Sequence, residues 1–275
     1  MKAHDMDIDP DEDLKKEPEV VPDKIKSSFD YRAFIGIAAL VISFHVLINY
    51  FISGDNADTA VSIFSMFVPL TLSIIGFSVV KKYKGTQVFG RAYLALSFGY
   101  LSIFFAEVTY AVYDIVYDIE PYPSIADVFF FMLYPLLLTY LFMNIKFFSP
   151  KLGIKSKLWI ILMPILVVIG YSIASITLGE ISIFEFDFYY GVVFVYAATL
   201  TLAVAIVGAS IFKQGVIGKA WLILVIGILL NNIGDIWYYN LELFGGYDLV
   251  HPVNMFWYAG YLVVIYALIK YKKTI

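Results

Sequence analysis

Two acidic residues stand inside long apolar runs of this chain. Glu107 interrupts the run "SIFFAEVTY" and Asp235 interrupts the run "NNIGDIWY". A carboxylate inside a bilayer is costly unless it faces a cavity or a polar partner. Tyr110 and Tyr238 each follow their acid by three residues, so each shares a helix face with it. This spacing indicates a polar stripe that either binds a small molecule or ties helices together.

The composition around these acids is that of a membrane protein. The chain is 61% hydrophobic and 15% charged, with a mean hydropathy of +0.80. Soluble domains are nearer a quarter charged. The absence of cysteine excludes disulfides, thiolate metal sites and cysteine nucleophiles. The net charge of −4 comes without a basic face, so we expect no nucleic-acid partner, and we also expect no cofactor and no metal.

The apolar residues gather in eight runs that are long enough to cross a bilayer as helices. The expected helices are 32–53, 58–80, 88–113, 123–145, 157–178, 187–212, 216–243 and 252–270. Residues 1–28 are rich in Asp, Glu, Lys and Pro, and we expect them to form a disordered cytoplasmic tail. The expected fold class is therefore an all-α integral membrane protein with eight transmembrane helices.

The basic residues predict the orientation of these helices. Apart from the tail and Arg32, they fall in or beside the loops that follow even-numbered helices, and at the C-terminus. They are Lys81, Lys82, Lys84, Arg91, Lys146, Lys151, Lys155, Lys157, Lys213, Lys219, Lys270, Lys272 and Lys273. The positive-inside rule then places both termini in the cytoplasm of a multi-pass protein of the cell membrane.

The two acids occupy matching positions in an internal repeat. Residues 88–110, "VFGRAYLALSFGYLSIFFAEVTY", align without gaps on residues 216–238, "VIGKAWLILVIGILLNNIGDIWY", with eight of 23 positions identical and an offset of 128. We therefore predict two parallel four-helix units, 29–150 and 151–275, related by a pseudo-two-fold axis along the membrane normal. In the following helix, Asp127 matches Asn254 and Tyr134 matches Tyr261.

The repeat also predicts where a site lies. Each acid lies 16 residues beyond a basic residue, about 24 Å from the cytoplasmic side, in the outer third of the bilayer. We therefore predict an outward-opening pocket between the units. The expected ligand-binding residues are Glu107, Tyr110, Asp127, Tyr134, Asn231, Asp235, Tyr238, Asn254 and Tyr261. The alternative, which stays open, is that the acids hold helices together through hydrogen bonds to Tyr and Asn.

Asp127 has a local explanation that competes with a role in binding. The segment "SIAD" places Ser124 at the N-cap and Asp127 at N3 of the fourth helix, which favours a capping box. In the second unit, "HPVN" places Asn254 at N3 in a weaker version of the same arrangement. We therefore interpret Asp127 as a capping residue at the rim of the pocket.

The segment "AEVTYAVYDIVYDIEPYPSIADVFFFMLYPLLLTYL" resembles a multi-span sensory-type region that precedes diguanylate cyclase, phosphodiesterase or histidine kinase domains in prokaryotes. The order of its acid, aromatic, "PS-x-AD" and "YP" elements carries the resemblance. The later segment "GDIWYYNLELFGGYDLVHPVNMFWYAGYL" is similar to the matching part of that region. No output domain follows "IKYKKTI", so the resemblance implies signalling through a separate cytoplasmic partner or a homo-oligomer.

A looser resemblance is to the lysoplasmalogenase-like eight-span membrane hydrolases, which place acids in the third and seventh spans. Glu107 and Asp235 match that placement and would be the catalytic acids of an intramembrane lipid hydrolase. The histidine expected on the next helix is not evident in "FFFMLYPLLL". Our leading hypothesis is a non-enzymatic sensory or ligand-binding protein that contacts membrane lipid and takes a small ligand from the outer side. A lipid hydrolase and a transporter of small solutes or ions are the alternatives.

Overall fold

The computed structural model describes residues 30–52, 54–119, 122–149, 151–179, 181–212, 216–244 and 246–273. Within these ranges the chain is helical and has no strand. The prediction of a disordered tail at 1–28 falls outside the described residues. The expected all-helical class is confirmed for the part of the chain that the structure describes.

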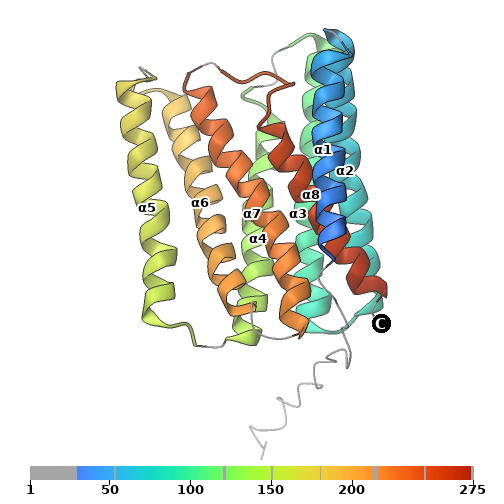
Figure 1. Cartoon of the computed structure of the whole chain (residues 1–275). Coiled ribbons are helices and arrows are strands. Elements are labelled where there is room, and N and C mark those ends of the chain that lie inside the picture. Colours follow the sequence, from blue (N-terminus) through green and yellow to red (C-terminus); the bar gives the residue numbers. More distant parts are fainter. Residues whose placement is uncertain are drawn as a thin grey trace, which may run out of the picture.

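In the part of the chain that the structure describes, eight α-helices make up the bundle drawn in Figure 1. They are α1 (Tyr31–Tyr50), α2 (Asp55–Lys82), α3 (Tyr93–Ala111), α4 (Ile125–Phe148), α5 (Ile154–Thr177), α6 (Phe186–Phe212), α7 (Val216–Glu242) and α8 (Asn254–Lys273). Two π-helical segments, η2 (Gln87–Ala92) and η3 (Val112–Val116), extend α3 at its two ends. The apolar runs predicted every helix closely, but they gave no sign of the π-helical turns.

Seven of the described helices are long and apolar enough to cross a membrane. In α8 the apolar stretch is shorter and covers Asn254–Lys270. A chain with this many apolar helices is a multi-pass membrane protein, because only such helices satisfy their backbone hydrogen bonds inside lipid.

Six helices form a closed ring. Following contacts around it, α2 packs against α3, α3 against α4, α4 against α6, α6 against α7, α7 against α8, and α8 against α2. Helix α1 lies outside this ring against α8 and α2. Helix α5 lies outside it against α6, and it forms one edge of the bundle in Figure 1.

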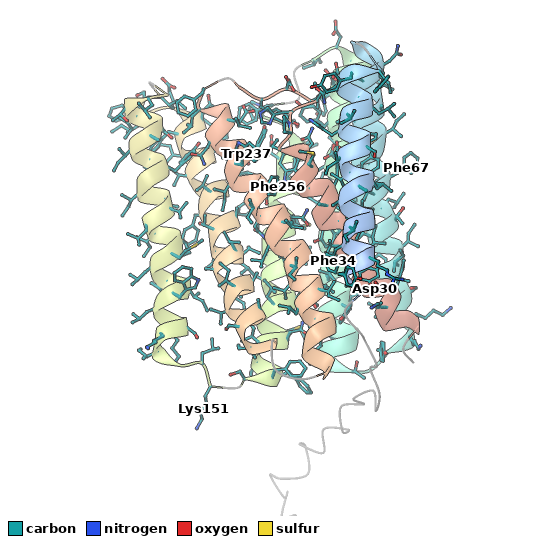
Figure 2. The ribbon with its side chains drawn as sticks, viewed as in Figure 1. Asp30, Phe34, Phe67, Lys151, Trp237 and Phe256 are labelled. Carbon is teal, nitrogen blue, oxygen red and sulfur yellow. The ribbon has the colours of Figure 1, made fainter. Side chains whose placement is uncertain are left out.

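The start of α1 and the end of α8 lie at the same end of the bundle (Figure 1). Lys151, in the loop between α4 and α5, lies at that end as well (Figure 2). We call it the basic end, because it carries Lys81, Lys82, Lys84, Lys146, Lys151, Lys155 and Lys157. The opposite end is called the acidic end, because it carries Asp114, Asp118, Asp127, Glu185, Asp187, Glu242 and Asp248.

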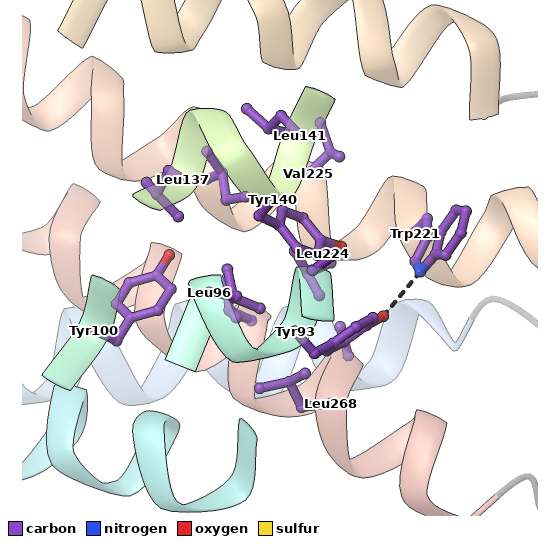
Figure 3. Packing of buried hydrophobic residues seen from close by; sticks show 14 of the residues in the cluster. Tyr93, Leu96, Tyr100, Leu137, Tyr140, Leu141, Trp221, Leu224, Val225 and Leu268 are labelled. Carbon is purple, nitrogen blue, oxygen red and sulfur yellow. Dashed lines mark hydrogen bonds between the residues drawn. The ribbon is translucent and has the colours of Figure 1, made fainter. Parts of the chain in front are cut away.

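Aromatic side chains fill much of the ring interior. Tyr93 and Trp221 are 0% exposed, and the indole Nε1 of Trp221 donates a hydrogen bond of 2.8 Å to the Tyr93 hydroxyl (Figure 3). The Tyr93 ring meets Tyr140 edge to face at 5.5 Å, and Phe148 meets Trp221 in the same way at 4.1 Å. These contacts join α3, α4 and α7 across the ring, nearer the basic end than the two acids are.

Candidate functional site

Asp235 of α7 is held by donors from two neighbouring helices. The indole Nε1 of Trp257, on α8, donates to its Oδ1 at 2.8 Å. The hydroxyl of Tyr134, on α4, also hydrogen-bonds to this carboxyl. Asp235 is therefore a cross-link between three helices, as the structural alternative expects.

Glu107 of α3 differs from Asp235 in its hydrogen bonding. Its side chain is partly buried, and no described residue forms a hydrogen bond with its carboxyl. Its charge interacts with the phenols of Tyr247, Tyr258 and Tyr261. A carboxylate is an acceptor that gains stability from donors or a cation, so Glu107 has unused capacity to bind one.

Tyr261 of α8 connects the two acids. It is 8% exposed and interacts electrostatically with both Glu107 and Asp235. Its ring meets that of Tyr100 edge to face at 5.7 Å. The fold thus brings two acids that are 128 residues apart in sequence to the same phenol.

Asn231 ties α7 to α8 and to α3, and it is 2% exposed. Its Nδ2 donates to the Trp257 carbonyl at 3.0 Å, and its Oδ1 accepts from the Tyr100 hydroxyl at 3.1 Å. Gly260 makes room for this amide, because a Cβ there would lie 2.7 Å from Asn231 Cγ and 2.8 Å from the Gly227 carbonyl oxygen. Asn231 therefore packs helices together beside the acids.

Three further predicted residues gather around Tyr247, in the loop between α7 and α8. The Tyr238 ring meets Tyr247 edge to face at 4.8 Å, and Tyr110 interacts electrostatically with both phenols. The Tyr247 hydroxyl lies 3.4 Å from Asn254 Oδ1, at the limit of hydrogen-bonding distance. Burial, followed by the nearby charge of Glu107, raises the pKa of Tyr247, so its phenol stays protonated as a donor.

Asp127 forms the predicted capping box. It accepts from the Ser124 backbone N at 2.6 Å, and Ser124 Oγ accepts from the Ala126 N at 3.1 Å. The structure adds a partner from α6, because the Tyr190 hydroxyl donates to Asp127 Oδ1 at 2.6 Å. Asp127 thus lies apart from the two deeper acids, at the acidic end.

The matching prediction for Asn254 holds only in part: His251 caps the helix start three residues before Asn254, but the Asn254 side chain does not complete a capping box. A backbone turn leads from His251 into α8, since the Asn254 N donates to the His251 carbonyl at 3.1 Å. The Asn254 side-chain amide, however, donates to the Leu249 carbonyl at 2.6 Å and does not turn back on the helix start. His251 supplies the cap, because its Nδ1 accepts from the Val253 N at 3.1 Å. Asn254 fixes the α7–α8 loop, which a local three-residue pattern does not predict.

Sequence reasoning missed several aromatic partners of the acids. They are Tyr100, Tyr190, Tyr247, Trp257 and Tyr258, which interact with the acids by hydrogen bonds or electrostatically. A buried indole N–H needs an acceptor, so Trp257 was a candidate for pairing with the acid on the preceding helix. The many tyrosines gave no such signal, because aromatic residues also fill cores and membrane interfaces.

Comparison of the chain with family models, curated proteins and solved structures finds no match. The two resemblances noted in the sequence therefore stay expectations. Among the described residues, no group of three or more His, Cys, Asp or Glu side chains is arranged to hold a metal ion.

Proposed function

We propose that this multi-pass membrane protein is a non-enzymatic, sensory-type ligand-binding module, and that Glu107 binds the ammonium group of a small molecule. The observation that carries the proposal is the unequal pairing of two matching acids. Asp235 has donors from Trp257 and Tyr134, whereas no described residue donates to Glu107. The missing donor is the contact that a bound cation would supply.

The surroundings of Glu107 favour an organic cation. Its charge interacts with the phenols of Tyr247, Tyr258 and Tyr261, and aromatic faces attract ammonium groups. Tyr247 in turn packs edge to face on Tyr238. A carboxylate beside several aromatic rings supplies both the charge and the cation–π contacts that an ammonium ligand uses.

The proposed entry side follows from the charges at the two ends of the bundle. The basic end would face the cytoplasm under the positive-inside rule, with both termini on that side. The acidic end would then face outward, and it includes the loop of Tyr247, whose phenol interacts with the charge of Glu107. A cationic ligand approaching from outside would meet acidic residues first.

The two-unit repeat is part of the same proposal, and its support comes from symmetry in the packing. Helix α2 packs against α8 as α6 packs against α4. Tyr134 of the first unit bonds to Asp235 of the second, while Tyr261 of the second unit interacts with Glu107 of the first. Reciprocal contacts of this kind are what a two-fold axis between similar units produces.

The hydrolase alternative has less support. Both donors on Asp235 are structural, and no histidine of the described residues hydrogen-bonds to either acid. An acid pair without a further base gives no evident way to activate water. Hydrolysis of ether lysolipids that is lost in Glu107→Gln would nevertheless favour this alternative over a purely binding role.

The test is a thermal-shift titration of the detergent-purified chain with choline, ethanolamine and putrescine. Acetate and glucose serve as the anionic and neutral probes. We expect at least one ammonium compound to raise the melting temperature in a concentration-dependent way, because a ligand of the folded state stabilises it. The rise should vanish in Glu107→Gln and persist in Asp248→Asn, an exposed acid of the same end. No shift with any amine, or an equal shift in Glu107→Gln, would reject the proposal.

A further inference from the structure

An apolar groove opens between α4, α5 and α6 on the outside of the ring. Its volume is about 340 Å³. It lies where α5 packs against α6 but, in the described residues, makes no extensive contact with α4. Its walls include Phe131, Tyr134 and Leu138 of α4, Val168 of α5, and Val193 and Ala197 of α6. From Phe131 to Leu138 the groove follows α4 for about 10 Å, roughly a third of the hydrocarbon thickness.

The corresponding place on the other side of the ring is filled by a side chain. There, Phe44 of α1 stacks on Phe64 of α2 at 4.5 Å and meets Tyr258 of α8 at 5.7 Å. With the offsets of the repeat, Phe64 matches Val192 and Tyr258 matches Phe131, and both of these line the groove. The filled counterpart indicates that the groove accepts a slender apolar group between its helices.

The end of the groove nearest the acidic end carries two carboxylates. Asp127 lies one helical turn before Phe131 on α4, toward the acidic end. Asp187, at the start of α6, accepts a hydrogen bond of 2.7 Å from the Tyr122 hydroxyl. Tyr122 interacts electrostatically with both carboxylates, and its ring meets that of Tyr190 edge to face at 4.9 Å.

No Lys or Arg on the adjoining stretches of α4, α5 and α6 balances these charges. The sequence has no Lys or Arg between residues 92 and 145, or between residues 158 and 212, which cover α6 and most of α4 and α5. An anionic headgroup would therefore be repelled from this rim, and an ammonium-bearing headgroup would be attracted to it.

From this geometry we infer that the groove is a specific site for one phospholipid with an ammonium headgroup. One acyl chain lies against Val193 and Leu138, and the headgroup reaches Asp127 and Asp187. The inference uses neither Glu107 nor the soluble ligand of the proposed function. The lipid site and the proposed function can therefore be tested independently.

The acyl-chain contact is tested by native mass spectrometry of the full chain in detergent. The protein is titrated with phosphatidylethanolamine or phosphatidylglycerol of equal chain length. We expect one phosphatidylethanolamine to stay bound at energies that strip phosphatidylglycerol. Val193→Trp, and Val193→Phe as a second variant, should weaken this binding about fivefold or more by filling the groove. Leu166→Trp, on the lipid-exposed face of α5, is the matched control and should bind normally.

The headgroup contact is tested without altering the groove. Asp187→Asn should reduce the preference for phosphatidylethanolamine by about two- to fivefold, because one exposed ionic contact is lost. Glu185→Gln, an exposed acid two residues away, should leave the preference unchanged. Equal binding of the two lipids, or no effect of filling the groove, would overturn the inference. If the wild-type protein is a dimer and Val193→Trp is a monomer, the inference is overturned, because a second copy of the chain then occupies the groove.

Discussion

The Trp221 indole donates its hydrogen bond to the Tyr93 hydroxyl at 2.8 Å, and the two residues are 128 positions apart. That separation equals the offset of the sequence repeat, so the bond joins matching positions of the two proposed units. Matching residues contact each other where a two-fold axis passes between like subunits. This bond would therefore mark the pseudo-two-fold axis inside the ring.

Removing this hydrogen bond should destabilise the protein although no cavity is created. Tyr93→Phe leaves the fully buried Trp221 N–H without its acceptor, at an expected loss of about 1–3 kcal/mol in the free energy of unfolding. The loss is measured by thermal or denaturant unfolding in detergent. Tyr189→Phe changes an exposed phenol of α6 and should have little effect. Equal stability of the two variants would argue against a structural role for the bond.

The two matching acids should respond differently to truncation. Asp235→Ala leaves the Trp257 N–H without its acceptor, so we expect a loss of about 1–3 kcal/mol in stability. Glu107→Ala removes no hydrogen bond among the described residues and should unfold at nearly the wild-type temperature. The comparison needs only melting curves recorded side by side. A larger loss in Glu107→Ala would contradict the pairing on which the proposed function depends.

Asp127 should contribute more to stability than its cap alone explains. Ser124→Ala removes a side-chain cap of α4 and should cost about 1 kcal/mol. Asp127→Ala also frees the Tyr190 hydroxyl, so its cost should exceed that of Ser124→Ala. Tyr190→Phe isolates the contact between α4 and α6, and a double-mutant cycle of Asp127 and Tyr190 should give a coupling well above zero. Additive losses would show that the two residues act independently.

Because the chain has no cysteine, its orientation can be read from single introduced cysteines. Lys151→Cys at the basic end should be protected from a membrane-impermeant maleimide in intact cells and labelled after lysis. Asp248→Cys at the acidic end should be labelled in intact cells. Both residues are exposed, so burial does not protect either one. The reverse pattern would invert the proposed orientation, including the side from which Glu107 is reached.

The helices of this protein follow from its sequence, because lipid leaves a long apolar segment no other way to pair its backbone groups. Seven runs of sufficient length, with a shorter eighth, end close to the predicted residues for that reason. The capping box at Ser124 and Asp127 was equally predictable, since it joins residues three apart on one helix start. The π-helical ends of α3 were not, because they depend on packing around the segment.

The pairing of the acids was decided by tertiary structure alone. Sequence placed Glu107 and Asp235 at matching positions, but the donors to Asp235 come from α4 and α8. The Asn254 side chain does not complete a capping box, because its amide donates to the Leu249 carbonyl in the preceding loop. The sequence thus determines spans, repeat pattern and local caps, which rest on short-range spacing. Contacts between helices that are distant in the chain decide which carboxylate receives hydrogen bonds. They also decide where α4 and α5 lie far enough apart to leave a groove.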